Sequence, residues 1–334
     1  MKKARDTAFL FATSLAMAVG VAHAEVVKIG QIEAKTGPFA SYGLMNIRGA
    51  AVAVDQINKA GGFTVNGKTY TLEMESEDTR GDPKEGLIQI KRLLEQEKVK
   101  FIFGPGTSGV FATVQPYAQR MNGKFIWMNG ASRGHSIIGT PNNEYYIRTW
   151  NWVSGKNGTG TRLTQYVKKV LAPKKIAMLF PNHEGGKVTA QVVTEILKEN
   201  KVDSVVEFYD VSVKDFGPIL SKLASQGADV LVPGLGSDEA AASDIVRQAA
   251  EGKYFTKFVA YNGGVLAPAL RNKDLIDAYI FDTPKYFPLA EKTEPKVKQF
   301  VTDYKNFYKE EFPYSLAATC VTVCYDHVFM LVKA

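Results

Sequence analysis

The chain has 334 residues, of which 45% are hydrophobic and 22% charged, a composition that is ordinary for a globular protein. This length is large for a single core and suits two domains. The 41 Lys and Arg residues exceed the 34 Asp and Glu residues, which gives a formal net charge of +7. No basic run is long enough to follow a phosphate backbone, so we expect no nucleic-acid partner and interpret the charge as a solubility feature.

The first 24 residues predict a cleaved signal peptide. Basic residues open the chain, residues 8–22 are almost entirely apolar, and Ala22-His23-Ala24 has the small-x-small form of a signal peptidase site. The apolar run is short for a membrane-spanning helix, no stop-transfer pattern follows it, and no Cys follows that would carry a lipid. An N-terminal membrane anchor is the alternative. We expect a secreted mature protein that begins at Glu25.

Short apolar runs then alternate with amphipathic stretches, which predicts repeated βα units around parallel sheets. In the first half we expect strands at 26–32, 70–77, 99–103 and 124–128, and helices at 42–58, 83–96 and 108–120. In the second half we expect strands at 175–180, 204–209, 230–232, 257–260 and 278–281, and helices at 157–170, 187–200, 216–226, 238–250, 296–312 and 315–332. The Gly-, Asn- and Trp-rich stretch 148–160 lies between two similar α/β halves, and we interpret it as a crossover.

Open α/β sheets bind ligands at the carboxyl ends of their strands, so the loops that follow strands are the candidate sites. The loop after the first strand, 36–43, is shaped by Gly and Pro and contains Tyr42. A Tyr at this position can cover a ligand with its apolar face and offer its hydroxyl. Turn chemistry and core packing are the alternative explanation for the same residues.

The loop after the third strand, 104–109, matches G-x-G-x-x-G, the pattern of a dinucleotide site. We reject that interpretation, because the fingerprint belongs to the first βα unit and needs an acidic residue about 20 positions further on, which this chain lacks. Free N–H groups and the Ser108 hydroxyl at a helix start still suit a carboxylate. A simple N-cap role for Ser108 remains the alternative.

The loop after the fourth strand, 129–134, is similar in kind. It offers the Ser132 hydroxyl, exposed backbone at Gly130 and Ala131, and the cation of Arg133. Two such loops side by side predict an anion clamp.

No catalytic residue and no cofactor are predicted. His183 and Glu184 in the second half have the chemistry for proton transfer, but no nucleophile elbow or zincin motif accompanies them. With four His in the chain, one of them in the signal peptide, a metal cluster is not expected. Cys320 and Cys324 lie one helical turn apart on an apolar segment, where buried thiols are favoured over a disulfide or a metal site with His327.

A series of short segments recurs in a fixed order over nearly the whole mature chain. They are Lys28-Ile29-Gly30, Thr36-Gly37-Pro38 with Tyr42-Gly43, Gly49-Ala50 with Ala53, Asp55-Gln56-Ile57-Asn58, Gly61-Gly62, Asp78, Asp82-Pro83, and Phe103-Gly104-Pro105 with Ser108. In this order and spacing they resemble the leucine/isoleucine/valine-binding family of periplasmic receptors. That resemblance is more specific than any single motif above.

The resemblance implies an α/β fold of the type I periplasmic binding proteins, with two doubly wound Rossmann-like lobes joined by a hinge of three crossovers. Lobe 1 would comprise 25–148 plus 285–334 and lobe 2 would comprise 149–284. It also implies a monomer in the periplasm that closes on a solute and docks on an inner-membrane ABC permease with its ATPase subunits. The family's chains continue further, so we interpret the sequence, which stops at Ala334, as truncated.

Carried over to this sequence, the family's carboxylate clamp falls on Ser108 and on the loop Gly130-Ala131-Ser132, and its aromatic wall falls on Tyr42. Arg133 is a possible extra cation beside the clamp, although it can equally face solvent. Asn262 takes the place of the Glu that meets the ligand ammonium in amino-acid binders.

Two departures bear on the ligand. An Asn cannot offset the charge of an ammonium, and an unpaired charge in a closed site is costly. Gly185 stands where the family often has a Tyr. The absence of that side chain enlarges the site. The sequence therefore predicts a small carboxylate-bearing solute, either an amino acid or an aromatic or organic acid. Asp238 or Glu239 remains able to take the ammonium role, and Trp150 or Trp152 can lie near an aromatic ligand.

Two other classes of protein compete with a solute receptor. A secreted Rossmann-type enzyme would need a glycine fingerprint in the first loop, and Thr36-Gly37-Pro38 is not one. A ligand-sensing module would use the same lobes with a membrane tether, which this sequence does not supply. Turnover and nicotinamide-cofactor binding would distinguish the enzyme from the receptor.

Overall fold

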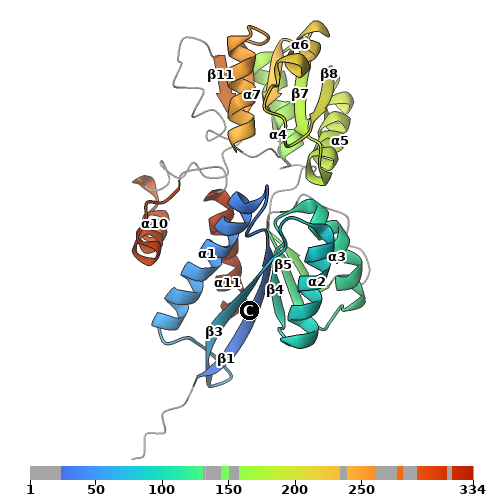
Figure 1. The fold of residues 1–334 in the computed structure, drawn as a ribbon. Helices are drawn as coiled ribbons and strands as arrows, with labels where there is room; N and C mark the ends of the chain where they lie inside the picture. The colour runs from blue at the N-terminus through green and yellow to red at the C-terminus, as the bar shows by residue number, and fades with distance from the viewer. Residues whose placement is uncertain are drawn as a thin grey trace, which may run out of the picture.

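The apolar strands of the chain assemble into two separate sheets, each covered by helices on both faces (Figure 1). The computed structural model describes residues 24–130, 132, 144–149, 158–233, 239–260, 277–280, 292–313 and 318–333. We call the body built on the first sheet lobe 1 and the body built on the second sheet lobe 2. The predicted signal peptide, apart from Ala24, lies outside the described residues.

The sheet of lobe 1 has the strand order β2-β3-β1-β4-β5-β6. Its strands are β1 (Glu25–Glu33), β2 (Phe63–Val65), β3 (Lys68–Asp78), β4 (Phe101–Phe103), β5 (Ile126–Asn129) and β6 (Tyr146–Arg148). All neighbours pair in parallel except β2 and β3. The register of β1 on β3 runs from Glu25 opposite Tyr70 to Glu33 opposite Asp78, which brings the carboxyl ends of the two long strands to one edge.

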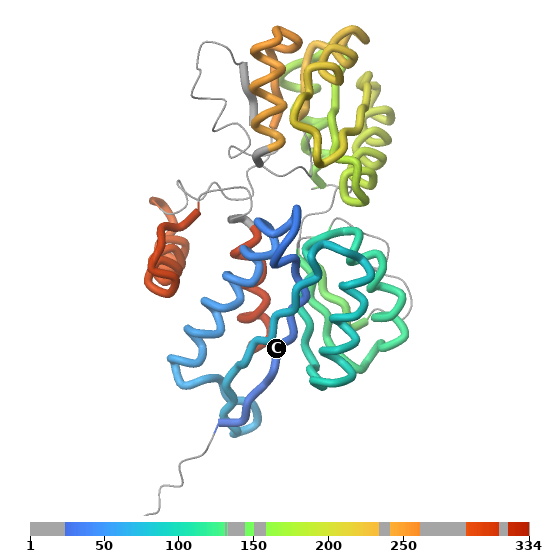
Figure 2. Tube along the Cα trace, viewed as in Figure 1, coloured from blue at the N-terminus to red at the C-terminus, as the bar shows by residue number. Residues whose placement is uncertain are grey.

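The helices of lobe 1 are α1 (Ala40–Lys59), α2 (Pro83–Lys91) with the π-helical turn η1 (Arg92–Gln96), α3 (Ser108–Arg120), α10 (Pro295–Tyr308) and α11 (Ala318–Lys333). They bury apolar side chains against opposite faces of this sheet, except α10, which packs on α1 and α11. Ile102 and Trp127 pack with the α2–α3 side, whereas Ile29 and Met128 pack with α1 and α11. The last helices therefore return to the lobe in which the chain began, and α11 lies beside α1 (Figure 2).

The sheet of lobe 2 has the order β11-β10-β9-β7-β8, and its pairings are parallel. Its strands are β7 (Ile176–Pro181), β8 (Ser204–Tyr209), β9 (Val230–Pro233), β10 (Lys257–Ala260) and β11 (Asp277–Ile280). Its helices are α4 (Thr159–Tyr166) with the π-helical turn η2 (Val167–Leu171), α5 (Glu184–Glu199), α6 (Gly217–Ser225) and α7 (Glu239–Glu251). The helices α6 and α7 cover one face and α4 and α5 the other.

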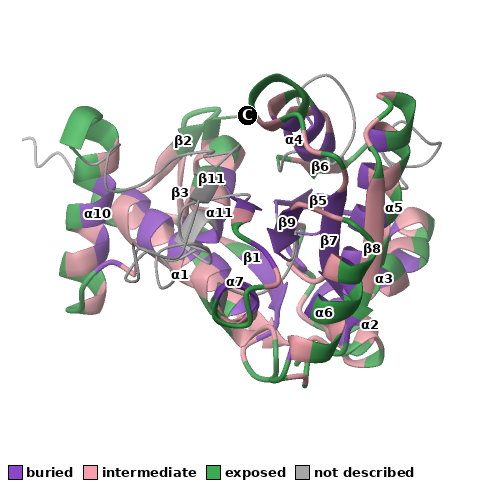
Figure 3. Ribbon diagram, turned by 90° about the horizontal axis from the view of Figure 1, so that it is seen from above, coloured by how far each residue is buried: buried purple, intermediate pink, exposed green. Residues whose placement is uncertain are grey.

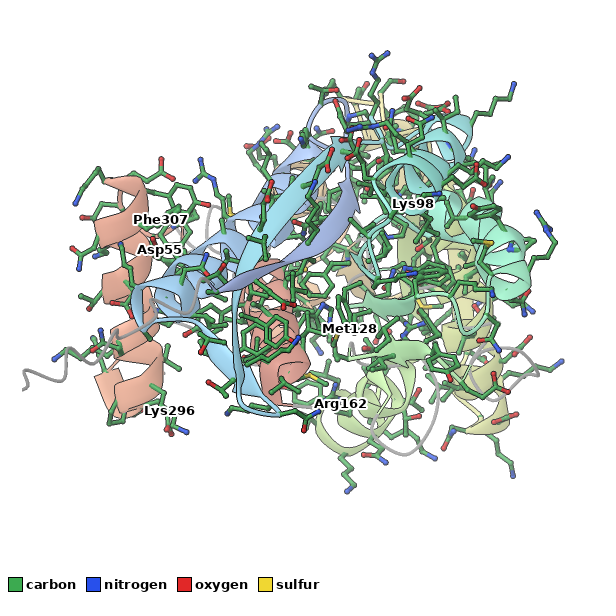
Figure 4. The ribbon with its side chains drawn as sticks, turned by 90° about the horizontal axis from the view of Figure 1, so that it is seen from below. Asp55, Lys98, Met128, Arg162, Lys296 and Phe307 are labelled. Atoms are coloured by element: carbon green, nitrogen blue, oxygen red, sulfur yellow. The ribbon has the colours of Figure 1, made fainter. Side chains whose placement is uncertain are left out.

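In both lobes the sheet forms the buried centre. Figure 3 shows buried residues along the central strands, while the outward faces of the helices are exposed. Met128 near the end of β5 lies among the interior side chains, whereas Lys296 of α10 lies at the periphery (Figure 4). This layered arrangement confirms the predicted α/β fold of two doubly wound lobes.

Most predicted elements are present with small shifts at their ends. The helix 108–120 and the strands 204–209 and 257–260 have the predicted bounds. The three-residue strands β2 and β6 were not predicted. The helix predicted from Lys187 begins at Glu184, because His183 caps it: the Gly186 N–H donates to His183 Nδ1 at 3.1 Å. Cys320 and Cys324 are buried free thiols, as expected.

Candidate site at the carboxyl ends of the strands

A buried carboxyl group marks the carboxyl end of β1. Glu33 is 1% exposed, and its Oε2 accepts the backbone N–H of Gly106 at 3.0 Å. Its Oε1 accepts the side-chain amide of Asn46 in α1 at 2.9 Å. Burial raises the pKa of Glu33 to about 8, outweighing these two hydrogen bonds, which lower it. Glu33 is therefore mostly protonated at neutral pH.

The loop 104–107 after β4 is held by side chains from two neighbouring strands, β1 and β5. Besides Gly106 on Glu33, the Trp127 indole donates to the Gly104 carbonyl at 2.5 Å, and the Asn129 amide donates to the Pro105 carbonyl at 2.7 Å. Gly104 has φ +84°, and a Cβ there would lie 2.4 Å from the Ile32 carbonyl oxygen. Only a glycine fits this close approach, so the loop has little freedom and fixes the start of α3.

The loop delivers Ser108 to the first turn of α3. Ser108 is 9% exposed and is the first helical residue, because the N-cap is Thr107, which makes no side-chain capping bond. The simple N-cap explanation for Ser108 is therefore wrong. A Cβ built on Gly185 of lobe 2 would lie 2.9 Å from Ser108 Oγ. Ser108 thus lies where α3 of lobe 1 meets α5 of lobe 2.

The loop after β5 is partly described. Ser132 is fully buried, its hydroxyl lies 3.1 Å from Asn129 Oδ1, and its backbone N–H donates to the same oxygen at 3.2 Å. Gly130 is buried against α11, because a Cβ there would lie 1.8 Å from Val323 Cγ1. Ala131, Arg133 and the second-lobe Asn262 lie outside the described residues.

Tyr42 lies in the first turn of α1 and is half-buried. The turn before it is anchored on Asp78 at the end of β3. The Thr36 hydroxyl donates to Asp78 Oδ2 at 2.7 Å, and the Lys35 N–H donates to Oδ1 at 2.8 Å. The same turn places Phe39 at the N-cap of α1.

Within the described part of the chain, Phe39 and Ser108 of lobe 1 approach His183 and Gly185 of lobe 2, and we call these four residues the interlobe seam. The rings of Phe39 and His183 lie 5.4 Å apart between centroids, edge to face at 75°. The built Cβ of Gly185 would lie 3.4 Å from His183 Cε1 as well as 2.9 Å from Ser108 Oγ. The seam joins loops at the carboxyl edges of both sheets, the location that open α/β sheets use for ligands.

Other polar groups lie behind this edge. His327 of α11 is buried, with Nε2 2.6 Å from Thr149 Oγ1 just after β6, and burial lowers its pKa to about 4. Among the residues that the structure describes, no three His, Cys, Asp or Glu side chains are grouped to hold a metal ion. In the same part of the chain, no helix is long and apolar enough to cross a membrane.

Ser108 and Tyr42 stay predicted ligand-binding residues, and the buried polar residues behind this edge were not predicted. Glu33, Asn46 and His327 are polar residues whose burial depends on helices far away in the sequence. An acidic residue closing an otherwise apolar run, as Glu33 does, was the available signal. His183 was considered for catalysis, whereas in the structure it caps α5 and contacts Phe39.

Residues 26–334 match the family model described as "Periplasmic binding protein". The chain belongs to the periplasmic binding protein family. This confirms the resemblance drawn from the sequence. It also accounts for the two doubly wound lobes, since the family is built on that fold.

Curated relatives of this family include Leu/Ile/Val-binding proteins. The chain is 28% identical over 228 residues to "Leu/Ile/Val-binding protein homolog 3" of Brucella melitensis, which covers 66% of this chain and 58% of that protein. It is 30% identical over 213 residues to "Leu/Ile/Val-binding protein BraC3" of Rhizobium johnstonii, covering 63% and 54%. The match therefore spans less than two thirds of the length of either relative.

Solved structures of type I periplasmic binding proteins share the fold. The branched-chain amino acid transporter substrate-binding protein LivJ of Streptococcus pneumoniae, in complex with isoleucine, superposes with a TM-score of 0.72 at 24% identity, covering 93% of this chain and 84% of that one. A solute-binding protein of an ABC transporter from Rhodopseudomonas palustris, in complex with 3,4-dihydroxybenzoic acid, gives 0.66 at 19% identity, covering 92% and 80%. At these identities the likeness shows the fold alone.

Proposed function

We propose that this protein is the periplasmic substrate-binding component of an ABC importer of the branched-chain amino acid type. It captures a small carboxylate-bearing solute between its lobes by hinge closure and delivers the solute to the permease. The observation that carries the proposal is the interlobe seam, where Ser108 at the start of α3 meets Gly185 of α5. A solute held there contacts both lobes, so its binding favours the closed form.

The proposed carboxylate clamp consists of the Ser108 hydroxyl, nearby backbone N–H groups, and the loop Gly130-Ala131-Ser132. A carboxylate at this edge meets a loop that Glu33, Trp127 and Asn129 already hold in place, so binding requires little ordering. Neutral Glu33 also removes a negative charge that would oppose an anion nearby. Ser132 would have to exchange its contact with Asn129 for one with the ligand, so we assign its backbone the larger share.

The remaining proposed contacts set the ligand class. Tyr42 forms an aromatic wall, Arg133 is an added cation, and Asn262 takes the place of an ammonium-binding Glu. Gly185 leaves space where a Tyr would pack. This combination favours an aromatic or other organic acid while leaving amino acids possible, and similar folds are known with isoleucine and with 3,4-dihydroxybenzoic acid.

The wider setting follows from the proposed role. We infer that residues 1–24 direct export to the periplasm and are removed. Lobe 1 would comprise 25–148 plus 285–334, and lobe 2 would comprise 149–284. The partners would be an inner-membrane permease and its ATPase subunits, with the receptor acting as a monomer without catalysis or cofactor.

A thermal-shift screen of the protein from Glu25 onward tests the proposal. The probes are leucine, isoleucine, benzoate and 3,4-dihydroxybenzoate. A solute that binds the folded state raises the melting temperature by mass action, by several degrees at saturation. Stabilisation by at least one probe supports the proposal and gives the class. If neither the amino acids nor the aromatic acids raise the melting temperature at millimolar concentration, the proposal is overturned.

A further inference from the structure

Phe39 is fixed between the two lobes. It lies at the N-cap of α1, and its ring packs over Gly81, where a Cβ would lie 2.7 Å from Phe39 Cδ2. Gly81 has φ +73°, so a glycine is favoured there on both counts. The ring of Phe39 then meets His183 edge to face at 5.4 Å. One ring therefore rests on its own lobe and touches the other.

The orientation of His183 is set within lobe 2. Its Nδ1 accepts the Gly186 N–H at 3.1 Å, which makes it the N-cap of α5. An accepting Nδ1 carries no proton, so the neutral ring is protonated on Nε2. The capping bond holds the imidazole at the edge of lobe 2, with Cε1 toward the position where Gly185 faces Ser108.

The contacts of His183 with Gly186 and with Phe39 are separable, because the first lies inside lobe 2 and the second crosses the seam. The first stabilises α5 whether the lobes are open or closed. The second exists only when the lobes are together, because Phe39 and His183 belong to different lobes. A contact that forms only on closure resists opening and leaves the first encounter with the solute unaffected.

We propose that Phe39 and His183 form a latch that holds the lobes closed and lengthens the residence time of the bound solute. This role rests on the proposed function. Edge-to-face aromatic pairs contribute enough to slow dissociation by roughly two- to tenfold. The effect falls on the dissociation rate, as most affinity changes within one interface do.

Substitutions at His183 separate the two contacts. His183→Asn keeps a side-chain oxygen for the N-cap but removes the ring. His183→Phe keeps a ring and removes the capping acceptor. We expect His183→Asn to release the solute two- to tenfold faster with an unchanged melting temperature of the unliganded protein. We expect His183→Phe to lower that melting temperature while keeping a dissociation rate near wild type.

Phe39→Ala completes a double-mutant cycle measured by stopped-flow release of the solute found in the thermal screen. Phe39→Ala combined with His183→Asn should dissociate no faster than the faster single variant, because both changes remove the same contact. The latch would be overturned if the two substitutions multiplied their effects on the dissociation rate of the solute. It would also be overturned if each single variant released the solute as slowly as wild type, or if His183→Phe released it as fast as His183→Asn.

A second readout needs no solute. Lys84 and Lys187 are exposed on opposite lobes, at the first turns of α2 and α5, and both native cysteines are buried. Spin labels on Lys84→Cys and Lys187→Cys report the interlobe distance. The latch predicts a larger open fraction in Phe39→Ala and His183→Asn than in wild type and His183→Phe. Identical distance distributions in all four would refute the latch, and a wild-type protein that closes but binds no tested solute would refute the proposed function alone.

Discussion

At the scale of single residues, the most unusual group is the buried carboxyl of Glu33. Its side chain accepts hydrogen bonds from Asn46 of α1 and from Gly106 of the loop 104–107. Among the described residues, no Lys or Arg forms an ion pair with it. Cys324 of α11 is a titratable group near it, and burial raises the pKa of that thiol, so it too is neutral. Glu33 is therefore a neutral positioning residue at neutral pH.

The raised pKa of Glu33 makes the stability of the fold decrease as the pH rises. The pKa of Glu33 is raised from 4.5 in the unfolded chain to about 8 in the fold. The stabilising contribution is fully present below pH 4.5 and is lost as the pH rises through 8, because the unfolded chain releases its proton first. Between pH 4.5 and 8 we expect the contribution of Glu33 to the free energy of unfolding to fall by on the order of 1 kcal/mol per pH unit.

Glu33→Gln tests the residue-scale account by urea denaturation across this window. The Gln amide is uncharged and nearly isosteric with the carboxyl group. The free energy of unfolding of the variant should therefore fall much less with rising pH, and near pH 8 it should exceed that of wild type. Glu73→Gln on the exposed part of β3 is the matched control and should keep the wild-type slope. A Glu33→Gln variant that keeps the same slope would show that Glu33 is ionised in the fold.

At the scale of elements, glycines set how closely helices approach. A Cβ on Gly49 of α1 would lie 1.8 Å from the carbonyl oxygen of Val321 in α11, which is backbone and cannot move aside cheaply. Gly49→Ala should therefore destabilise lobe 1 by roughly 2–4 kcal/mol, measured by chemical denaturation. Gly109→Ala in α3 is the control, since its Cβ would meet only Pro83 Cγ at 3.8 Å. Equal stability of both variants would contradict the close packing of α1 on α11.

The helix α5 makes the corresponding approach between lobes. A Cβ at Gly185 would lie 2.9 Å from Ser108 Oγ, so Gly185→Ala should keep the lobes from closing fully and weaken solute binding by about fivefold or more. The unliganded melting temperature should hold or rise slightly, because Ala favours helix over Gly. Calorimetry with the best-stabilising solute measures the affinity. Unchanged affinity would mean that the bound form does not bring Ser108 and Gly185 together.

The elements themselves were largely predictable, and the reasons differ from place to place. The helix 108–120 has clear limits in the sequence, because a glycine-rich loop precedes it and Gly123 follows it. The strands β2 and β6 were missed because three residues carry too short a pattern. The start of α5 depends on a His cap, an unusual capping residue that propensity does not favour.

The candidate site was predictable only in part. Ser108 and Tyr42 lie in the first turns of the helices that follow β4 and β1, so the strand–helix order brings them to the carboxyl edge. The burial of Glu33 and the contact between Phe39 and His183 depend on how α1 and the two lobes pack, which one sequence does not specify. Arg133 and Asn262 stay predictions.

At the scale of the whole molecule, the chain leaves lobe 1, builds lobe 2 and returns. The aromatic residues of α10 join α1 and α11 in a common cluster that includes Val52, Phe300 and Tyr304. Two lobes that are each stabilised by their own cores can move as rigid bodies. The seam is then the place where closure can be coupled to a solute.

The central claim is that this closure captures a small carboxylate through Ser108. Isothermal titration calorimetry of wild type and Ser108→Ala against isoleucine and 3,4-dihydroxybenzoate tests it most directly, with Ser225→Ala on the surface of α6 as control. We expect saturable one-to-one binding of one solute, with an affinity about tenfold weaker in Ser108→Ala and unchanged in Ser225→Ala. Equal affinity of wild type and Ser108→Ala, or no binding of either solute, would contradict it.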